Sequence, residues 1–221
     1  MSDLPNNPVE AAFGPLYGLP CWNVKPGHGS FLTLEFGKPQ LEFHEPRETK
    51  RPRSLKVRKH HARRRVIMHS EWHLWVYCCY WNFFLNGSLI GDSNSEKGIQ
   101  RAVEELNGQK LVSVTANQLL GHSVFEFDLG GRLTTRPYDK TYQEPSTQWM
   151  LFEPSGDILS LRGDGLYSHQ PGNTPPKEEW WQSLTDDADP QLKRGADGKW
   201  MIEVPELPGV LAYGQSREEA A

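Results

Sequence analysis

The chain has 221 residues, a formal net charge of −4 at neutral pH and 24% charged side chains. This length suits one well-cored domain with a small addition, and no run of about 20 apolar residues predicts a membrane-spanning helix. Three cysteines do not make a disulfide framework and no signal-peptide pattern opens the chain, so the sequence predicts a cytoplasmic protein.

The first elements in chain order are an irregular stretch and a hairpin. Residues 1–30 are rich in Pro, Gly and Asn and are typical of an irregular lead-in. Residues 31–36 and 41–43 alternate apolar and polar side chains around a Gly-Lys-Pro turn, which predicts that they pair as a β-hairpin.

A strongly basic stretch follows the predicted hairpin. Residues 47–65 hold ten of the 24 Lys and Arg against one acid, which leaves 14 basic against 27 acidic side chains in the rest of the chain. Residues 45–65 have too few apolar side chains to bury, so they are expected to form a mobile loop.

Clustered basic side chains release counterions on contacting phosphates, which favours nucleic-acid binding. The alternative is a solvated loop that folds against the acidic remainder, because no aromatic residue is interleaved to stack on bases. The candidate nucleic-acid contacts are Arg51, Arg53, Arg58, Lys59, Arg63, Arg64 and Arg65.

Residues 71–85 are the most aromatic part of the chain, and their density predicts a central strand with both faces covered. Within such a strand Cys78 and Cys79 would point to opposite faces, each buried as a small apolar group.

A turn and a helix are predicted next. Asn86-Gly87 is typical of a turn into a short return strand at 88–90. Residues 96–106 place Ile99, Val103 and Leu106 on one helical face, after Ser93 or Ser95 as the cap. Residues 110–117 and 123–129 then alternate as strands, the second entering a hairpin at Gly130-Gly131.

Two further strands, at 148–153 and 158–162, flank a Pro-Ser-Gly-Asp turn, and residues 166–168 follow a Gly-Asp-Gly turn. The chain then becomes rich in Pro and acids, and the Trp pair at 180–181 is expected to pack back on the sheet. The predicted class is α+β, mainly β: a meandering antiparallel sheet with one main helix. Residues 1–182 form the domain, 183–190 a linker and 191–221 a separate segment.

The segments WNVKPGHGSFLTLEFG, SEWHLW, FDLGG and QWML, the last followed by a GDG turn, resemble a bacterial family of cytoplasmic domains without an assigned activity. The resemblance covers residues 1–182 and carries no catalytic residues with it.

A metal site is the enzymatic or metal-binding alternative. His69, Glu71 and His73 lie on one face of the expected strand, and His and Glu side chains are ordinary transition-metal ligands. A structural pair of histidines is the competing interpretation, because no fourth ligand of defined spacing follows. The sequence has no GxSxG, P-loop or GxGxxG motif, and no cofactor is expected.

Residues 197–220 carry a Gly-x-Trp strand, Pro-Glu-Leu-Pro-Gly, a return strand ending in Gly, and a Ser-x-x-Glu capping box. This pattern resembles the N-terminal part of the HicB antitoxin family of bacterial toxin–antitoxin systems, with the later strand and helices of that unit missing. The resemblance implies a partner-binding surface of Trp200, Pro205, Glu206, Leu207, Pro208, Gly209 and Tyr213.

The sequence therefore favours a non-catalytic protein-interaction module, for which the HicB resemblance implies a HicA-like ribonuclease toxin as partner. The segment 191–221 is below the roughly 40 residues that usually fold alone, so docking on the domain or pairing with a second copy is expected. The metal protein and the nucleic-acid-binding protein are the alternatives.

Overall fold

The computed structural model describes residues 7–47, 58–59, 61–117, 121–138, 145–174, 177 and 180–182, and the backbone of residues 192–194, 200–203 and 211–214. In these residues the protein is mainly β, with antiparallel sheets and a longest helix of 11 residues. The predicted α+β, mainly β class is confirmed. Among these same residues, no helix has the length and apolar character needed to cross a membrane.

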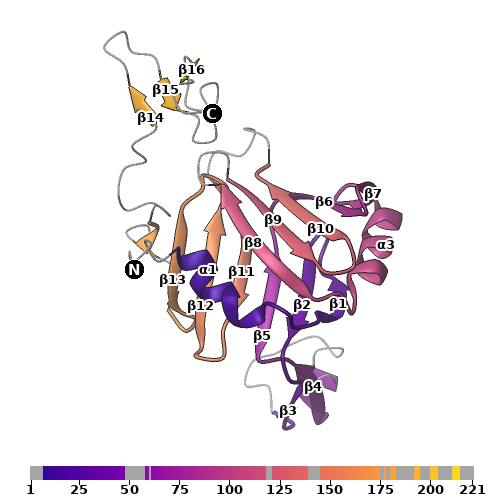
Figure 1. The fold of residues 1–221 in the computed structure, drawn as a ribbon. Coiled ribbons are helices and arrows are strands. Elements are labelled where there is room, and N and C mark those ends of the chain that lie inside the picture. The colour runs from indigo at the N-terminus through magenta and orange to yellow at the C-terminus, as the bar shows by residue number, and fades with distance from the viewer. Residues whose placement is uncertain are drawn as a thin grey trace.

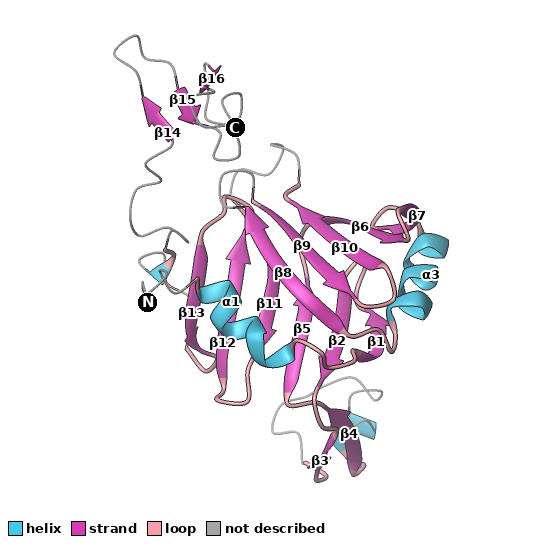
Figure 2. Ribbon diagram, viewed as in Figure 1, coloured by secondary structure: helices cyan, strands magenta, loops and turns pink. Residues whose placement is uncertain are grey.

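Two large antiparallel sheets make up the main body (Figures 1 and 2), where the sequence predicted one. The six-stranded sheet has the order β1 (Trp22–Pro26), β2 (Leu32–Phe36), β5 (Trp72–Val76), β11 (Thr147–Phe152), β12 (Asp157–Arg162) and β13 (Tyr167–Pro171). The five-stranded sheet has the order β7 (Ser88–Asp92), β6 (Tyr80–Leu85), β10 (Gly131–Arg136), β9 (His122–Phe127) and β8 (Leu111–Asn117).

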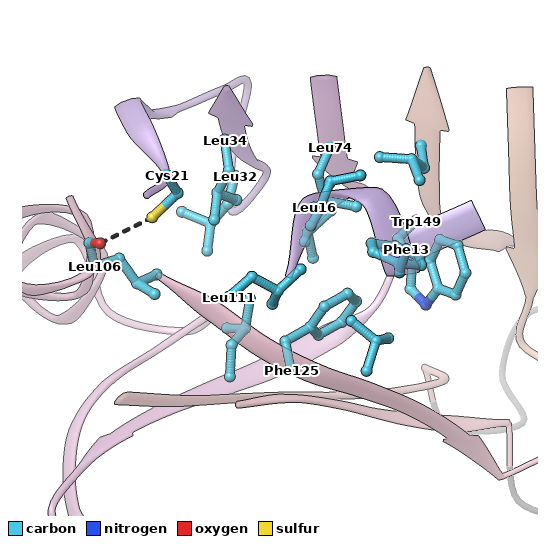
Figure 3. Packing of buried hydrophobic residues seen from close by; sticks show 14 of the residues in the cluster. Phe13, Leu16, Cys21, Leu32, Leu34, Leu74, Leu106, Leu111, Phe125 and Trp149 are labelled. Atoms are coloured by element: carbon cyan, nitrogen blue, oxygen red, sulfur yellow. Dashed lines mark hydrogen bonds between the residues drawn. The ribbon is translucent and has the colours of Figure 1, made fainter. Parts of the chain in front are cut away.

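The two sheets share one core (Figure 3). Leu34, Leu74 and Trp149 enter it from the six-stranded sheet, and Leu111 and Phe125 from the five-stranded sheet. All five side chains are fully buried. Alternation along each strand places apolar residues on the facing sides of the sheets, which is why both sheets contribute to a single core.

Part of the stretch 1–30, predicted as an irregular lead-in, is regular: it contains β1, and residues 8–16 are helical. They form α1 (Pro8–Phe13) and the short 3-10 helix η1 (Gly14–Leu16). The side chain of Asn7 caps the first turn. Pro8 follows at the first helical position, where an N–H would have no partner within the helix, so the missing N–H of proline costs no hydrogen bond. Phe13 is completely buried between an aromatic residue of β9 and one of β11, so α1 packs against both sheets.

The predicted helix is confirmed as α3 (Glu96–Leu106), with Ser95 as the N-cap. Of its predicted apolar face, Val103 and Leu106 are buried and Ile99 packs partly buried against the core. The helix contacts β7 and β1, the edge strands of the two sheets, and so covers one side of the core.

The aromatic run predicted as one central strand is in fact two strands, β5 and β6, which belong to different sheets. The backbone turns between them, where the N–H of Cys79 donates to the carbonyl of Tyr77. Only one face of β5 is fully covered: Leu74 and Val76 are buried, whereas Trp75 is partly exposed. The prediction of one strand with both faces covered was wrong. The aromatic residues are instead divided between two strands of different sheets, and in each strand alternate side chains point into the core.

The three cysteines are free thiols. Cys21 and Cys79 are buried, and Cys78 is half-buried in the turn rather than on a strand. The expected pair of buried cysteines on opposite strand faces is therefore incorrect.

The predicted hairpin of residues 31–36 and 41–43 does not form. Strand β2 pairs with β1 and β5, and β3 (Gln40–His44) pairs with β4 (Arg65–His69) in a separate two-stranded sheet. The apolar residues of β2 are buried in the core, whereas those of β3 are exposed, so burial draws β2 into the larger sheet.

Several local predictions are confirmed. Asn86 and Gly87 have positive φ angles of 49° and 79°, as a tight β6–β7 turn requires. The β9–β10 and β11–β12 pairs are antiparallel hairpins, and β13 follows where expected. Trp181 lies against Arg162 of β12, and Gln182 pairs with Tyr167 of β13, as expected for a segment packing back on the sheet.

The C-terminal strands β14 (Leu192–Arg194), β15 (Trp200–Glu203) and β16 (Leu211–Gly214) form a small antiparallel sheet. Strands β15 and β16 lie where the sequence predicted strands at 199–204 and 210–213. The predicted linker at 183–190 lies outside the described residues.

Candidate functional site

The three residues predicted as metal ligands each have a different position and partner. His69 ends β4, Glu71 lies in the following turn, and His73 is on β5. The Glu71 carboxylate accepts a hydrogen bond from the N–H of Lys38 at 3.1 Å, and His73 Nδ1 lies 3.0 Å from Glu35 Oε1. The described residues do not bring His69, Glu71 and His73 together as one set of ligand atoms.

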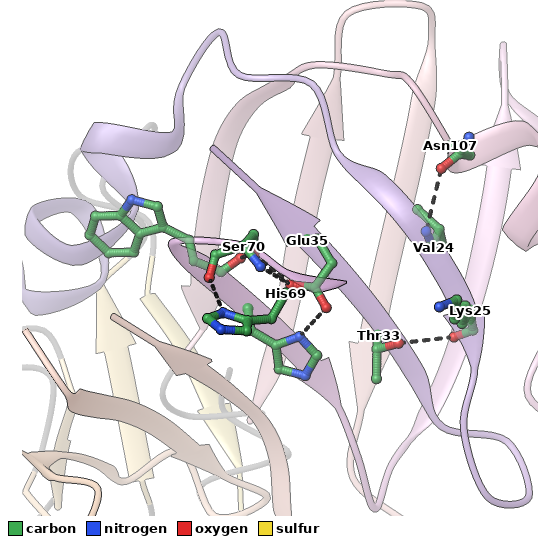
Figure 4. Close-up of polar contacts among 9 residues, drawn as sticks. Val24, Lys25, Thr33, Glu35, His69, Ser70 and Asn107 are labelled. Atoms are coloured by element: carbon green, nitrogen blue, oxygen red, sulfur yellow. Dashed lines mark hydrogen bonds and ion pairs between the residues drawn. The ribbon is translucent and has the colours of Figure 1, made fainter. Parts of the chain in front are cut away.

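Glu35 instead organises this region (Figure 4). Its buried carboxylate accepts hydrogen bonds from the N–H of Ser70 at 3.2 Å, from Ser70 Oγ at 2.5 Å, and from His73 Nδ1. Burial raises the pKa of Glu35, but the hydrogen bonds from His73 and Ser70 outweigh it and hold the pKa below its usual value. Glu35 is therefore an ionised carboxylate that accepts hydrogen bonds from Ser70 and His73.

This network does not have the geometry of a nucleophile activated by a base. Such a pair needs the hydroxyl bonded to the imidazole, and Ser70 Oγ contacts Glu35 and the carbonyl of Trp72 instead. Within the described residues no hydrogen bond joins Ser70 to His73. These hydrogen bonds connect β2, β5 and the turn between β4 and β5, so the network has a structural role.

The network lies at the base of the two-stranded β3–β4 sheet. We call β3, β4 and the described residues between them (45–47, 58–59 and 61–64) the arm. In Figures 1 and 2 the two strands project from the end of the main body. Ser70 follows the arm, Lys38 precedes it, and their contacts with Glu35 and Glu71 fix both chain segments at the base.

One face of the arm is apolar and exposed. The cross-strand pairs Leu41–Met68 and Phe43–Val66 fall on the same side, because side chains alternate along a strand. The exposed fractions are 60% for Leu41, 60% for Phe43, 54% for Val66 and 46% for Met68. A contiguous exposed patch of large apolar side chains on a marginal two-stranded sheet is typical of an interaction surface.

His44 pairs with Arg65 at the end of the arm away from the main body, and described residues of the basic stretch adjoin this pair. Of the predicted nucleic-acid contacts, Arg58, Lys59, Arg63 and Arg64 are exposed and Arg65 begins β4, while Arg51 and Arg53 lie outside the described residues. Arg64 Nε pairs with Glu45 Oε1 at 2.9 Å, and the N–H of Arg47 donates to the carbonyl of His61. The arm thus combines an apolar face with a positively charged end.

The residues predicted to bind a partner in the C-terminal segment are only partly described. Trp200 pairs with Gly214, and Met201 with Tyr213, across β15 and β16. The predicted residues from 205 to 209 lie outside the described part of the chain. The antiparallel pairing of β15 and β16 agrees with the two strands predicted in this segment.

Sequence reasoning missed a depression of about 680 Å³ on the five-stranded sheet, lined in part by β9 and β10. Arg132 Nε pairs with Glu126 Oε1 at 3.1 Å, and the guanidinium of Arg136 lies over the ring of Tyr80 at 4.2 Å. Burial and the nearby Arg136 lower the pKa of His122, which lies at its edge. The alternating pattern of β9 and β10 predicted two strands, but it did not show that β9 and β10 would together line a depression.

A second missed group is Glu153, Asp157 and His169. Their potential ligand atoms all lie within 4.8 Å of one another, which holds for no other set of three His, Cys, Asp or Glu among the described residues. The Glu and Asp flank a predicted turn, but nothing in the sequence indicated that the histidine of the following strand would join them.

Comparison of the chain with protein-family models, curated proteins and solved structures finds no match.

Proposed function

We propose that the chain is a protein-binding module that uses the arm to bind an acidic partner protein. The observation that carries this proposal is the exposed apolar face of Leu41, Phe43, Val66 and Met68, on a sheet whose β4 begins at Arg65 and follows the exposed Arg63. The partner's complementary surface would present an apolar strip bordered by Asp and Glu side chains.

The energetics support a binding surface. Complete burial of one large aliphatic or aromatic side chain is worth about 1.5–3 kcal/mol. Because the four side chains are roughly half exposed, covering them would contribute about 3–6 kcal/mol before the costs of association. The base contacts of Glu35 and Glu71 hold the arm in place, which reduces the conformational entropy lost on binding.

Charge favours a protein over a nucleic acid. The chain outside residues 47–65 carries 14 basic against 27 acidic side chains, which would repel an extended polyphosphate lying along the main body. A partner protein can instead place its acidic residues against the end of the arm alone. The four apolar side chains also favour a protein surface, because phosphate contacts rely on charged and polar groups.

The C-terminal hairpin supports the same class of function. HicB family members use the resembling unit to bind and inhibit a ribonuclease toxin, so for the C-terminal segment, as distinct from the arm, a HicA-like toxin is the partner that this resemblance favours. Trp200 and Tyr213 belong to the paired strands β15 and β16, consistent with that unit.

The test is site-specific photo-crosslinking in the full chain. A photoreactive phenylalanine analogue at position 43 should crosslink to a protein in the source cells. The same analogue at position 129, where Leu129 is also exposed, should not. The crosslinked protein is then purified and titrated against the chain by calorimetry.

Phe43→Asp should weaken that binding about 30-fold, as expected for a central contact worth about 2 kcal/mol, while Leu129→Asp should change it less than about twofold. Equal effects of the two variants, or no crosslink specific to position 43, would refute the proposal. Crosslinks to RNA or DNA, with affinity falling steeply with salt, would replace the protein partner by a nucleic acid.

A further inference from the structure

Three potential metal ligands lie on adjacent strands of the six-stranded sheet, away from the arm. Glu153 directly follows β11, Asp157 begins β12, and His169 is on β13. The N–H of Glu153 donates to the carbonyl of Asp157 at 2.9 Å, and His169 pairs with Leu159. The antiparallel ladder therefore fixes the three backbones, and alternation directs their side chains to the same face.

This face is the one that contributes Leu151 and Leu159 to the core. The side chain of Glu153 is only 12% exposed, and that of His169 is 40% exposed. The group thus extends from the buried interior to the surface, so an ion from solvent can reach it.

The atomic geometry favours shared coordination. Glu153 Oε1 is inaccessible to solvent, and His169 Nε2 lies 3.0 Å from it. Two ligands bound to one ion at about 2.0–2.2 Å lie roughly 3.0–3.4 Å apart, depending on the coordination number. The observed separation fits two neighbouring ligand positions, and Asp157 is within reach of a third.

The electrostatics also favour a cation. The ligand atoms of Glu153 and Asp157 lie within 4.8 Å of each other, so their negative charges repel when both carboxylates are ionised. A divalent ion would stabilise both carboxylates in their ionised form and bond the imidazole in its neutral form.

We propose that Glu153, Asp157 and His169 form a binding site for a divalent transition-metal ion. Two carboxylates and one imidazole suit zinc, manganese or iron(II), whereas calcium takes six to eight oxygen ligands and magnesium avoids nitrogen. Three protein ligands leave at least one position for water or a further ligand, as in catalytic rather than structural metal sites.

Equilibrium dialysis and calorimetry with Zn²⁺ on the untagged full chain, freed of metal by chelation, test the site. One Zn²⁺ should bind per chain and raise the melting temperature. His169→Ala and Asp157→Asn should each weaken binding at least tenfold and abolish the thermal shift. Asp157→Asn preserves shape, so it reports ligand loss even if the histidine variant folds poorly.

His69→Ala is the matched control, because His69 belongs to the set that the sequence pattern favoured. It should bind Zn²⁺ like the unmodified chain. The proposal is overturned if no stoichiometric Zn²⁺ binds at millimolar concentration, if both ligand variants retain full affinity, or if His69→Ala abolishes binding.

Discussion

Phe13 is the residue whose removal should most directly show how the main body is held together. It ends α1, is completely buried, and packs edge-to-face on Phe125 of β9 at 5.9 Å and on Trp149 of β11 at 5.5 Å. These two rings are themselves in edge contact at 6.0 Å, so the three side chains form a cluster that spans both sheets.

Phe13→Ala should therefore cost near the upper end of the range for buried Phe. Such truncations cost about 3–5 kcal/mol, and each lost aromatic pair accounts for about 0.5–1.5 kcal/mol of that loss beyond simple area. We expect a loss of about 4–5 kcal/mol, which is a large fraction of the roughly 5–15 kcal/mol that stabilises a typical domain. Phe13→Leu fills most of the space and should cost only about 1–2 kcal/mol.

Urea denaturation followed by tryptophan fluorescence measures this effect, because Trp149 is in contact with the altered position. Leu129→Ala is the surface control and should change stability by less than about 0.5 kcal/mol, since Leu129 is 66% exposed. If Phe13→Ala cost no more than Leu129→Ala, α1 would not be part of the core and the account of the two-sheet junction would fail.

Two further predictions concern titrating groups. Glu35→Gln removes a carboxylate with a lowered pKa, so it should cost about 1–3 kcal/mol above the ordinary pKa of 4.5. Because that contribution disappears as the pH falls through the folded-state pKa, urea midpoints of the variant and the unmodified chain should converge at low pH; a constant gap from pH 7 to pH 3 would contradict this. Burial raises the pKa of Cys21 to about 12 and that of Cys79 well above its usual range, whereas Cys78 is half-buried. Iodoacetamide at pH 8 should therefore modify Cys78 first in the native protein, and mass spectrometry showing Cys21 or Cys79 modified as fast as Cys78 would refute the burial argument.

The sequence determined the elements whose signals are local. The cap at Ser95 and the apolar spacing of residues 96–106 defined α3, because a helix is specified within a few turns. Asn86 and Gly87 defined the β6–β7 turn, since few other residues adopt their positive φ angles readily. The mainly antiparallel class followed from repeated signals of this kind.

The choice of strand partners was decided only by the tertiary structure. The Gly-Lys-Pro turn between β2 and β3 predicted that these two strands pair. Instead β2 pairs with β1 and β5 and buries its apolar residues, and β3 pairs with β4, which is about 20 residues further along the chain. The aromatic run split between two sheets for the same reason. Pairing depends on the total area buried, which a short window of sequence does not contain.

The candidate sites divide in the same way. The basic charge of residues 47–65 was evident from the sequence, but the exposed apolar face beside it depends on the register of β3 against β4. The metal ligands that the sequence favoured were close neighbours in the chain, whereas Glu153, Asp157 and His169 come together only because β12 and β13 pair in one register. A site formed across strands is fixed by that pairing, and the energy that selects the pairing comes from the core.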